Sequence, residues 1–291
     1  MRKRCKTLLI MGIFLSLFFL FTGTSLLHAA QARCHAVDWD SQNATCQSTN
    51  GNFEKACSYW IGEMEDHWSV TTKSSNTFGI ELCDSEFESS CCDNTGDNLD
   101  NGDATLLATH GGTEYGDRFE AQMSSPNWNP GGDDCRSNSN YWMLGDNDAE
   151  FVALFACHSL QKQYVNGWGT VPNHWRAHTR RLHQLQGFQG SLSTGQKDEL
   201  DDFADDAFDG AVSWAWIENM TIWGANTGKP YDRCGINLIF GYNKVDAHIR
   251  RDFERYHPTQ FPDPPSTGDW TTQHFYCNCD APAAPTLICG Q

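Results

Sequence analysis

The stretch Ala-Thr-Leu-Leu-Ala-Thr-His-Gly-Gly, residues 104–112, decides how this 291-residue chain is expected to fold. It begins with a nearly uninterrupted apolar run and ends in a histidine followed by two glycines. A second stretch, Phe-Val-Ala-Leu-Phe-Ala-Cys-His-Ser at residues 151–159, has the same plan with a cysteine near its end. Short apolar runs of this kind are typical of strands that are buried on both faces, as in a parallel sheet.

Further segments extend this alternation of strands and helices. Two more apolar runs, 185–192 and 236–242, are expected to be buried strands of the same sheet. Helix candidates lie around and between the runs, at residues 52–66, 172–182, 197–220 and 245–256. Pro172 suits the first turn of its helix, and Ser193 with Gln196 resembles a capping box before the longest one. Strands alternating with helices predict an α/β sandwich whose ligands bind at the carboxyl ends of the strands.

The charge of the chain limits its partners. It carries 37 acidic and 20 basic side chains, which gives a formal net charge of −17. Nucleic acids and anionic membranes require clustered Lys and Arg, so we expect neither to be a main partner. Hydrophobic residues make up 39% of the chain, which at this length is enough to fill a sizeable core. The composition therefore predicts a folded protein with neutral or cationic partners.

The N-terminus has the pattern of a secretory signal peptide. A basic stretch from Arg2 to Lys6 precedes the almost wholly apolar run 8–21, and small residues at 30–32 offer a cleavage position. An uncleaved anchor helix is the alternative. We expect residues 1–32 to be a signal peptide, the protein to be secreted or periplasmic, and its contact with the membrane to be transient and limited to this peptide.

Three zones follow the signal peptide. Residues 33–66 are expected to form a cysteine-containing N-terminal extension, 67–257 the α/β domain, and 258–291 a Pro-rich linker with a cysteine-containing tail. Thirteen cysteines are more than a protein of the reducing cytosol normally uses, so they indicate disulfides formed in an oxidising compartment. The two ends are thus expected to be disulfide-tied extensions of one central domain.

The ends of the first two strands carry the candidate chemistry. If the strands are neighbours, their ends lie about 5 Å apart, so His110 and Cys157 can face the same crevice. A nearby imidazole helps a thiol to become a thiolate and later donates a proton to the leaving group. The backbone N–H groups of Gly111 and Cys157 would then stabilise an oxyanion. His158 would point to the opposite face of an extended strand, so we expect it to be structural.

A strand ending in His-Gly, followed some tens of residues later by a strand ending in Ala-Cys, resembles the pattern of the caspase, gingipain, legumain and clostripain superfamily of cysteine peptidases. The resemblance covers roughly residues 67–257 and includes a Gly-rich turn at 187–191. It implies an exported bacterial branch with a caspase-like three-layer sandwich and a mostly parallel central sheet. It also implies His110 as general base, Cys157 as nucleophile, a protein or peptide substrate, and no required cofactor.

The chain departs from this pattern in places. The pentapeptide that surrounds the caspase cysteine is absent, and so is a recognisable basic pocket, which leaves the cleavage preference open. Glu114 is a candidate for orienting His110, on the ground of its proximity in sequence alone. Two other classes of function remain open: a non-catalytic caspase-like protein that binds a protein or glycan at the cell surface, and a disulfide-rich structural or adhesive domain.

The number of cysteines bears on the choice between these classes. Removing Cys5 with the signal peptide and setting Cys157 aside as nucleophile leaves eleven of the thirteen. Eleven cysteines cannot all pair within one chain, so the peptidase interpretation requires a further free or intermolecular cysteine. The expected places are Cys91-Cys92 and Cys277-x-Cys279.

The sequence contains two groups of possible metal ligands. The acidic, Gly-containing loop before residue 104 makes calcium possible, with Asp97, Asp100 and Asp103 as the candidate ligands. Their spacing does not match an EF-hand loop, so a solvated polar turn is the favoured alternative. A zinc site is not expected among His174, His178 and His183, because the neighbouring arginines would repel a cation.

Overall fold

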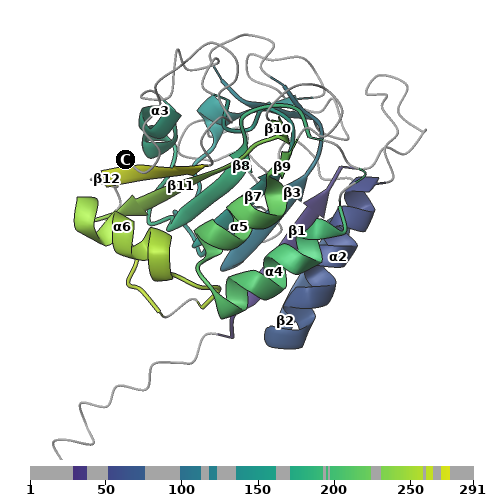
Figure 1. Ribbon diagram of the computed structural model, residues 1–291, viewed down its shortest axis with the longest axis horizontal. Coiled ribbons are helices and arrows are strands. Elements are labelled where there is room, and N and C mark those ends of the chain that lie inside the picture. Colours follow the sequence, from purple (N-terminus) through teal and green to yellow (C-terminus); the bar gives the residue numbers. More distant parts are fainter. Residues whose placement is uncertain are drawn as a thin grey trace, which may run out of the picture.

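The computed structural model describes residues 29–37, 52–75, 99–112, 118–122, 136–161, 171–192, 195, 197–223, 231–257, 260–264 and 270–275. Its centre is a seven-stranded sheet with the order β12-β11-β8-β7-β3-β1-β2 (Figure 1). The strands are β1 (Gln31–Ala36), β2 (Val70–Ser75), β3 (Ala104–Ala108), β7 (Phe151–Phe155), β8 (Gln184–Phe188), β11 (Gly235–Gly241) and β12 (Trp270–Phe275). The five strands from β8 to β2 are parallel to one another, and β11 is antiparallel to both of its neighbours.

Helices cover one face of this sheet. They are α2 (Asn52–His67), α4 (Glu199–Asp209) and α5 (Val212–Met220), with α6 (Lys244–Phe253) packed beside α5 against β11 and β12. Strand β3 is buried throughout, and its successive residues alternate between the two cores, with Leu106 under the helices and Leu107 on the other face. Among the described residues, none of the helices is long and apolar enough to cross a membrane.

The second face of the sheet has a different cover. It carries α3 (Val171–Ala177), the 3-10 turn η2 (Ser139–Tyr141) and a small antiparallel sheet of β4 (Gly111–Gly112), β5 (Glu120–Gln122) and β6 (Arg136–Asn138). The buried tryptophans Trp142 and Trp175 fill the space between these segments and the strands. A further short ribbon joins β9 (Ile222–Trp223) to β10 (Tyr231–Arg233). The described chain therefore forms an α/β sandwich of three layers around a mostly parallel sheet.

The strands expected at the two motifs are confirmed, while several boundaries differ. The helix expected to reach residue 182 ends at Ala177, and the long helix expected over 197–220 is interrupted at Gly210 and Ala211 to give α4 and α5. Asp198 caps α4 without a side-chain hydrogen bond, whereas Ser193 and Gln196 lie outside the described residues. Of the run expected at 236–242, residues 236–241 are buried in β11 and Tyr242 is exposed; β11 pairs antiparallel with β8 after a connection that contains α4, α5, β9 and β10.

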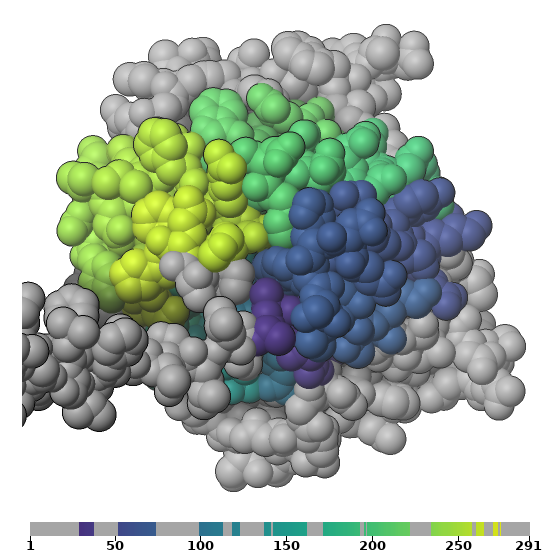
Figure 2. Space-filling model, turned by 90° about the horizontal axis from the view of Figure 1, so that it is seen from below, coloured from purple at the N-terminus to yellow at the C-terminus, as the bar shows by residue number. Residues whose placement is uncertain are grey.

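Both terminal segments belong to the central sheet, which corrects the expected extensions. Strand β1 lies between β3 and β2, and α2 packs on it, so the described residues 33–37 and 52–66 are part of the domain. Residues 31 and 32, which were assigned to the signal peptide, are the first two of β1. Strand β12 adds an edge strand from the expected tail, beyond residue 257. Figure 2, seen from below, shows β1 in purple between the blue of α2 and the yellow of the C-terminal part.

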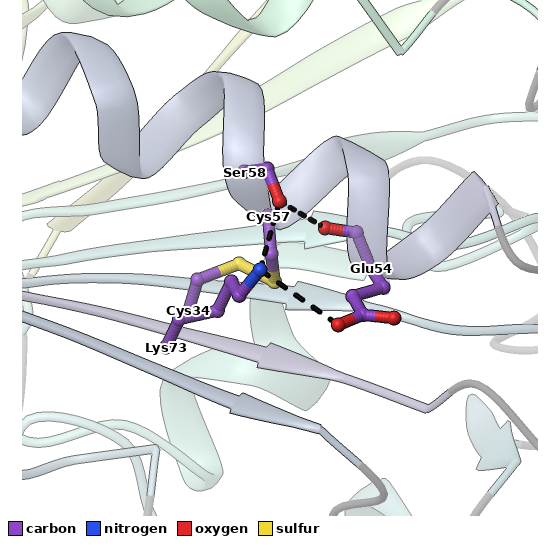
Figure 3. Close-up of a disulfide and its surroundings, with 5 residues drawn as sticks. All are labelled: Cys34, Glu54, Cys57, Ser58 and Lys73. Carbon is purple, nitrogen blue, oxygen red and sulfur yellow. Dashed lines mark hydrogen bonds and ion pairs between the residues drawn. A yellow bond between two sulfur atoms is a disulfide. The ribbon is translucent and has the colours of Figure 1, made fainter.

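A disulfide fastens β1 to the helical layer (Figure 3). Cys34 of β1 is bonded to Cys57 of α2, and both side chains are almost completely buried. Lys73, the partner of Cys34 in the register of β1 and β2, donates a hydrogen bond to Ser58 Oγ over 2.9 Å. Lys73 Nζ also lies 3.8 Å from a carboxylate oxygen of Glu54. Two strands are thereby connected to one turn of α2.

We expect loss of this disulfide to weaken the domain as a whole. The cross-link spans 23 residues, and the restriction that it places on the unfolded chain corresponds to about 3 kcal/mol of the free energy of unfolding. Urea unfolding of a Cys34→Ala, Cys57→Ala double variant would measure the loss. The wild-type chain under reducing conditions is the matched control, and an unchanged unfolding midpoint in both would contradict the expectation.

Candidate active site

Two adjacent parallel strands, β3 and β7, place His110 and Cys157 at their carboxyl ends. Ala108 of β3 pairs with Phe155 of β7, and the Thr109 N–H donates to the Phe155 carbonyl over 3.3 Å. His110 and Cys157 each follow two residues after this pair, so they occupy corresponding positions on adjacent strands. The expectation that the two strands are neighbours is confirmed. Their ends form the edge of the sheet at which α/β proteins bind ligands.

Gly111 allows the two strand ends to approach closely. A Cβ atom at this position would lie 2.1 Å from the carbonyl oxygen of Cys157 and 2.8 Å from the ring of Phe119. No side chain fits there unless the backbone of Cys157 moves. The glycine was expected because its backbone N–H can reach a substrate carbonyl; the structure adds a second reason, which is the close packing of Gly111 on the Cys157 peptide. Its place in an oxyanion hole stays a prediction.

Cys157 is a free thiol, and among the cysteines that the structure describes it is the one without a disulfide. Its sulfur accepts a hydrogen bond from the Leu192 N–H over 3.1 Å, and the thiol faces the Leu192 carbonyl oxygen at 3.7 Å. Burial raises the pKa of the Cys157 thiol, and the Leu192 N–H opposes this shift only in part. The resting group is therefore a protonated thiol. Cys91, Cys92, Cys277 and Cys279, the expected places of a further unpaired cysteine, lie outside the described residues.

His110 lies half-buried beside the helical layer. Its ring meets the ring of Phe53 of α2 edge to face, with the centroids 4.9 Å apart. Its carbonyl oxygen accepts the Gln122 N–H over 2.8 Å, which fixes the backbone where β3 passes into β4. Burial lowers the pKa of His110. At neutral pH the imidazole is uncharged, so the two candidate residues rest as a neutral pair and not as a thiolate and an imidazolium.

The turn that follows β7 is fixed to the end of β8. His158 has a positive φ of 60°, a conformation rare for residues other than glycine. Its N–H donates to the Gly190 carbonyl over 2.9 Å, and the Leu160 N–H donates to the Phe188 carbonyl over 3.0 Å. The Ser159 hydroxyl accepts the Phe188 N–H over 2.9 Å. His158 therefore does not continue an extended strand, as was assumed, and its Nε2 lies 3.4 Å from Ser191 Oγ.

Residues of the loop after β8 complete the site; the sequence pattern indicated a Gly-rich turn at 187–191 but not its contacts with Cys157 and His158. Ser191 and Leu192 reach His158 and Cys157 through backbone and hydroxyl groups, which have no distinctive spacing in a sequence. Glu114, the expected orienting acid, lies outside the described residues. The site as described therefore consists of His110, Gly111, Cys157 and the loop that contains Leu192.

The acidic loop before β3 serves the fold. Both Asp100 carboxylate oxygens accept backbone N–H groups, one from Gly145 and the other from Asn147, the second over 2.7 Å. Asp103 accepts the Gln31 N–H over 2.6 Å and so holds the start of β1. Asp97 lies outside the described residues. Calcium binding by these three residues stays a prediction, with a structural role established for two of them.

The histidine group near α3 divides into two parts. The rings of His174 and His178 are 4.7 Å apart, and burial with the neighbouring His178 lowers the pKa of His174 to about 3. His174 Nε2 lies 3.0 Å from Ser139 Oγ, which joins α3 to η2. His183 directly precedes β8, and its Nδ1 lies 2.8 Å from Glu254 Oε1. Among the described residues, His183 groups with Glu150 and Asp263 and not with His174 and His178.

The chain belongs to a protein family described as a domain of unknown function (DUF6345), whose model matches residues 39–268. This range includes α2 and every strand of the central sheet except β1 and β12. It also includes both His110 and Cys157. A search of curated proteins found no match.

Substitution of Gly111 tests the close approach of the strand ends. We expect Gly111→Ala to lower the free energy of unfolding by about 2–3 kcal/mol, because the new methyl group overlaps the Cys157 carbonyl. Gly62→Ala is the matched control: Gly62 lies in α2 with open space around it, and alanine there is expected to raise stability by up to about 1 kcal/mol. Equal unfolding midpoints for the two variants would contradict the packing described.

Proposed function

We propose that this protein is a secreted cysteine peptidase with a caspase-like fold, in which His110 and Cys157 act as a catalytic dyad. The observation that carries the proposal is the register of β3 and β7, with an imidazole and a free thiol at corresponding positions beyond Ala108 and Phe155. A half-buried free thiol at the carboxyl end of a parallel strand lies where α/β enzymes bind their substrates. Its neighbour on the adjacent strand is the residue type that activates thiols.

The reaction follows from the neutral resting state of the pair. When a peptide carbonyl approaches, His110 takes the proton from the Cys157 thiol, and the sulfur bonds to the carbonyl carbon. The amides of Gly111 and Cys157 are proposed to stabilise the resulting oxyanion. The C–N bond then breaks, the amine leaves with the proton from His110, and a thioester remains. Water, deprotonated by His110, hydrolyses the thioester and restores the thiol.

The contact between Cys157 and Leu192 bears on how the thiol is released. In the resting chain the thiol hydrogen faces the Leu192 carbonyl and the sulfur accepts the Leu192 N–H. The hydrogen has to turn from Leu192 toward His110 before transfer. Because the N–H can stay bonded to the sulfur while this happens, it stabilises the developing thiolate.

The substrate and location of the enzyme are parts of the same proposal. The net charge of −17 favours neutral or cationic peptide segments over acidic ones. The signal-peptide pattern before β1 and the disulfide between β1 and α2 both favour an exported protein. No cofactor is needed for the proposed reaction.

A second candidate is a non-catalytic protein of the same fold that binds a protein or glycan. The raised pKa of Cys157 and its two contacts with the backbone of Leu192 favour it, because an unreactive buried cysteine has the same features.

Three variants test the dyad on a mixed library of fluorogenic peptides. We expect Cys157→Ala to lower kcat/KM by at least about 10³-fold, and His110→Ala by about 10²–10⁴-fold. His158→Asn is the matched control, since it changes the adjacent histidine while asparagine tolerates the positive φ; its kcat/KM should stay within a few-fold. Circular dichroism of each variant checks that it is folded. A folded wild-type chain that cleaves nothing, or a Cys157→Ala variant with full activity, would support the second candidate.

The pH profile tests which protonation state is active. Since burial lowers the pKa of His110 below its ordinary value of 6.5, the imidazole stays in its basic form in mildly acidic solution. We expect kcat/KM to hold as the pH falls to 6.5 and to decline only at lower pH, where His110 gains a proton. An acid limb above pH 6.5 would contradict the lowered pKa of His110, and a limb that persists in His110→Ala would belong to another group.

A further inference from the structure

A second group of ionisable side chains lies at the amino ends of the strands, away from the dyad. Glu150 directly precedes β7, His183 directly precedes β8, and Asp263 belongs to the segment after α6. One ligand atom from each lies within 4.8 Å of the other two. Seven residues of extended chain separate Glu150 from Cys157, so the two places are roughly 20 Å apart.

His183 presents a nitrogen that has no hydrogen-bond partner. The side chain is almost completely buried, and Nδ1 lies 2.8 Å from Glu254 Oε1. Glu254 also accepts hydrogen bonds from Gln184 and Arg250, which hold its carboxyl group beside His183 Nδ1. Nε2 makes no hydrogen bond and faces Asp263 Oδ1 at 3.6 Å. A carboxylate that fixes one imidazole nitrogen while the other stays available is the arrangement around metal-bound histidines.

The backbone holds the three residues in place. The Glu150 carbonyl accepts the N–H groups of His183 and Gln184 over 2.8 and 3.1 Å, which sets the relative positions of the first two ligands. The Asp263 carbonyl accepts the Tyr242 hydroxyl over 2.6 Å, and Arg250 binds the carbonyl of the preceding Pro262. These contacts order the segment that carries Asp263 although its side chain is half-exposed.

The charges of the group favour a cation. Glu150 Oε2 is buried without a hydrogen-bond partner. Asp263 Oδ2 lies 4.0 Å from Arg181 Nη1, while the other carboxylate oxygen, Oδ1, faces His183 Nε2. One oxygen of Asp263 is therefore directed toward the group, and the buried Glu150 oxygen adds a second carboxylate ligand.

We propose that Glu150, His183 and Asp263 bind a divalent transition-metal ion, with zinc as the best match, at a site separate from the dyad. An imidazole nitrogen with two carboxylates suits zinc and its neighbours, whereas calcium and magnesium prefer oxygen ligands alone. Ligands of a tetrahedral zinc ion lie about 3.3 Å apart, close to the 3.6 Å between His183 and Asp263. The half-exposed side of Asp263 gives the ion access and leaves water the fourth position.

Zinc titration of the full chain, freed of metal with a chelator, tests the proposal. We expect one equivalent to bind in competition with a chromophoric chelator, and saturation to raise the midpoint of thermal unfolding by about 5 °C or more. Cobalt(II) used in place of zinc reports the ligand type. Visible bands without a sulfur-to-cobalt charge-transfer band indicate nitrogen and oxygen ligands, and such a charge-transfer band would assign the ion to a cysteine thiolate and overturn the proposal.

Variants identify the ligands independently of folding. Asp263→Asn should weaken zinc binding by about 100-fold or more. Substituting a residue that only hydrogen-bonds to a metal ligand already weakens metal binding by about 10–100-fold, and loss of a ligand itself should cost at least as much. Glu150→Gln keeps the size of this buried side chain and removes its charge, so it should fold in the presence of chelator and still lose the zinc-induced rise in unfolding temperature.

The control comes from a second group of possible ligands, Glu63, His67 and Asp205, which lies on the surface. His67→Gln should leave zinc binding unchanged. Absence of zinc binding to the wild-type chain, retention of full affinity in both Asp263→Asn and Glu150→Gln, or loss of binding in His67→Gln would each overturn the proposal. None of these results depends on whether the chain is a peptidase.

Discussion

Burial of β3 and β7 on both faces is the constraint on which the rest of the structure depends. All five residues of each strand are inaccessible to water, with apolar layers above and below. Polar side chains in the middle of these strands would have to find partners within the core. The functional groups therefore lie at the two ends of the sheet, where the chain enters and leaves it.

The two ends differ in their electrostatics. At the carboxyl ends, burial favours the neutral forms of both His110 and Cys157, and the groups that contact the thiol belong to the backbone. At the amino ends, a buried network joins Glu254 with Arg250 and His183. One end is arranged for proton transfer between uncharged groups, and the other for holding charge in place. The two ends of the same sheet therefore provide two different electrostatic environments, one that favours uncharged side chains and one that stabilises charged ones.

The sequence predicted what depends on short-range pattern. The apolar runs identified β3 and β7, and the prediction that the strands before His110 and Cys157 are neighbours is confirmed. It did not identify β1, whose residues Gln31–Ala36 include arginine and histidine and show no continuous apolar run. The strand becomes part of the sheet through its pairing with β3, some 70 residues later. The group of Glu150, His183 and Asp263 was missed for the same reason: its members come from three separate parts of the chain.

The central position of β1 has a consequence for how the chain can be shortened. Ala32 pairs with both Thr71 and Ala104, and its side chain is fully buried. Removal of the first turn of a peripheral helix leaves a fold intact, whereas removal of β1 would leave β2 without a neighbour and separate Cys57 from its partner. The start of a stable domain is therefore defined to within a residue or two, at Gln31. A processing enzyme that cut deeper than this would remove part of the sheet itself.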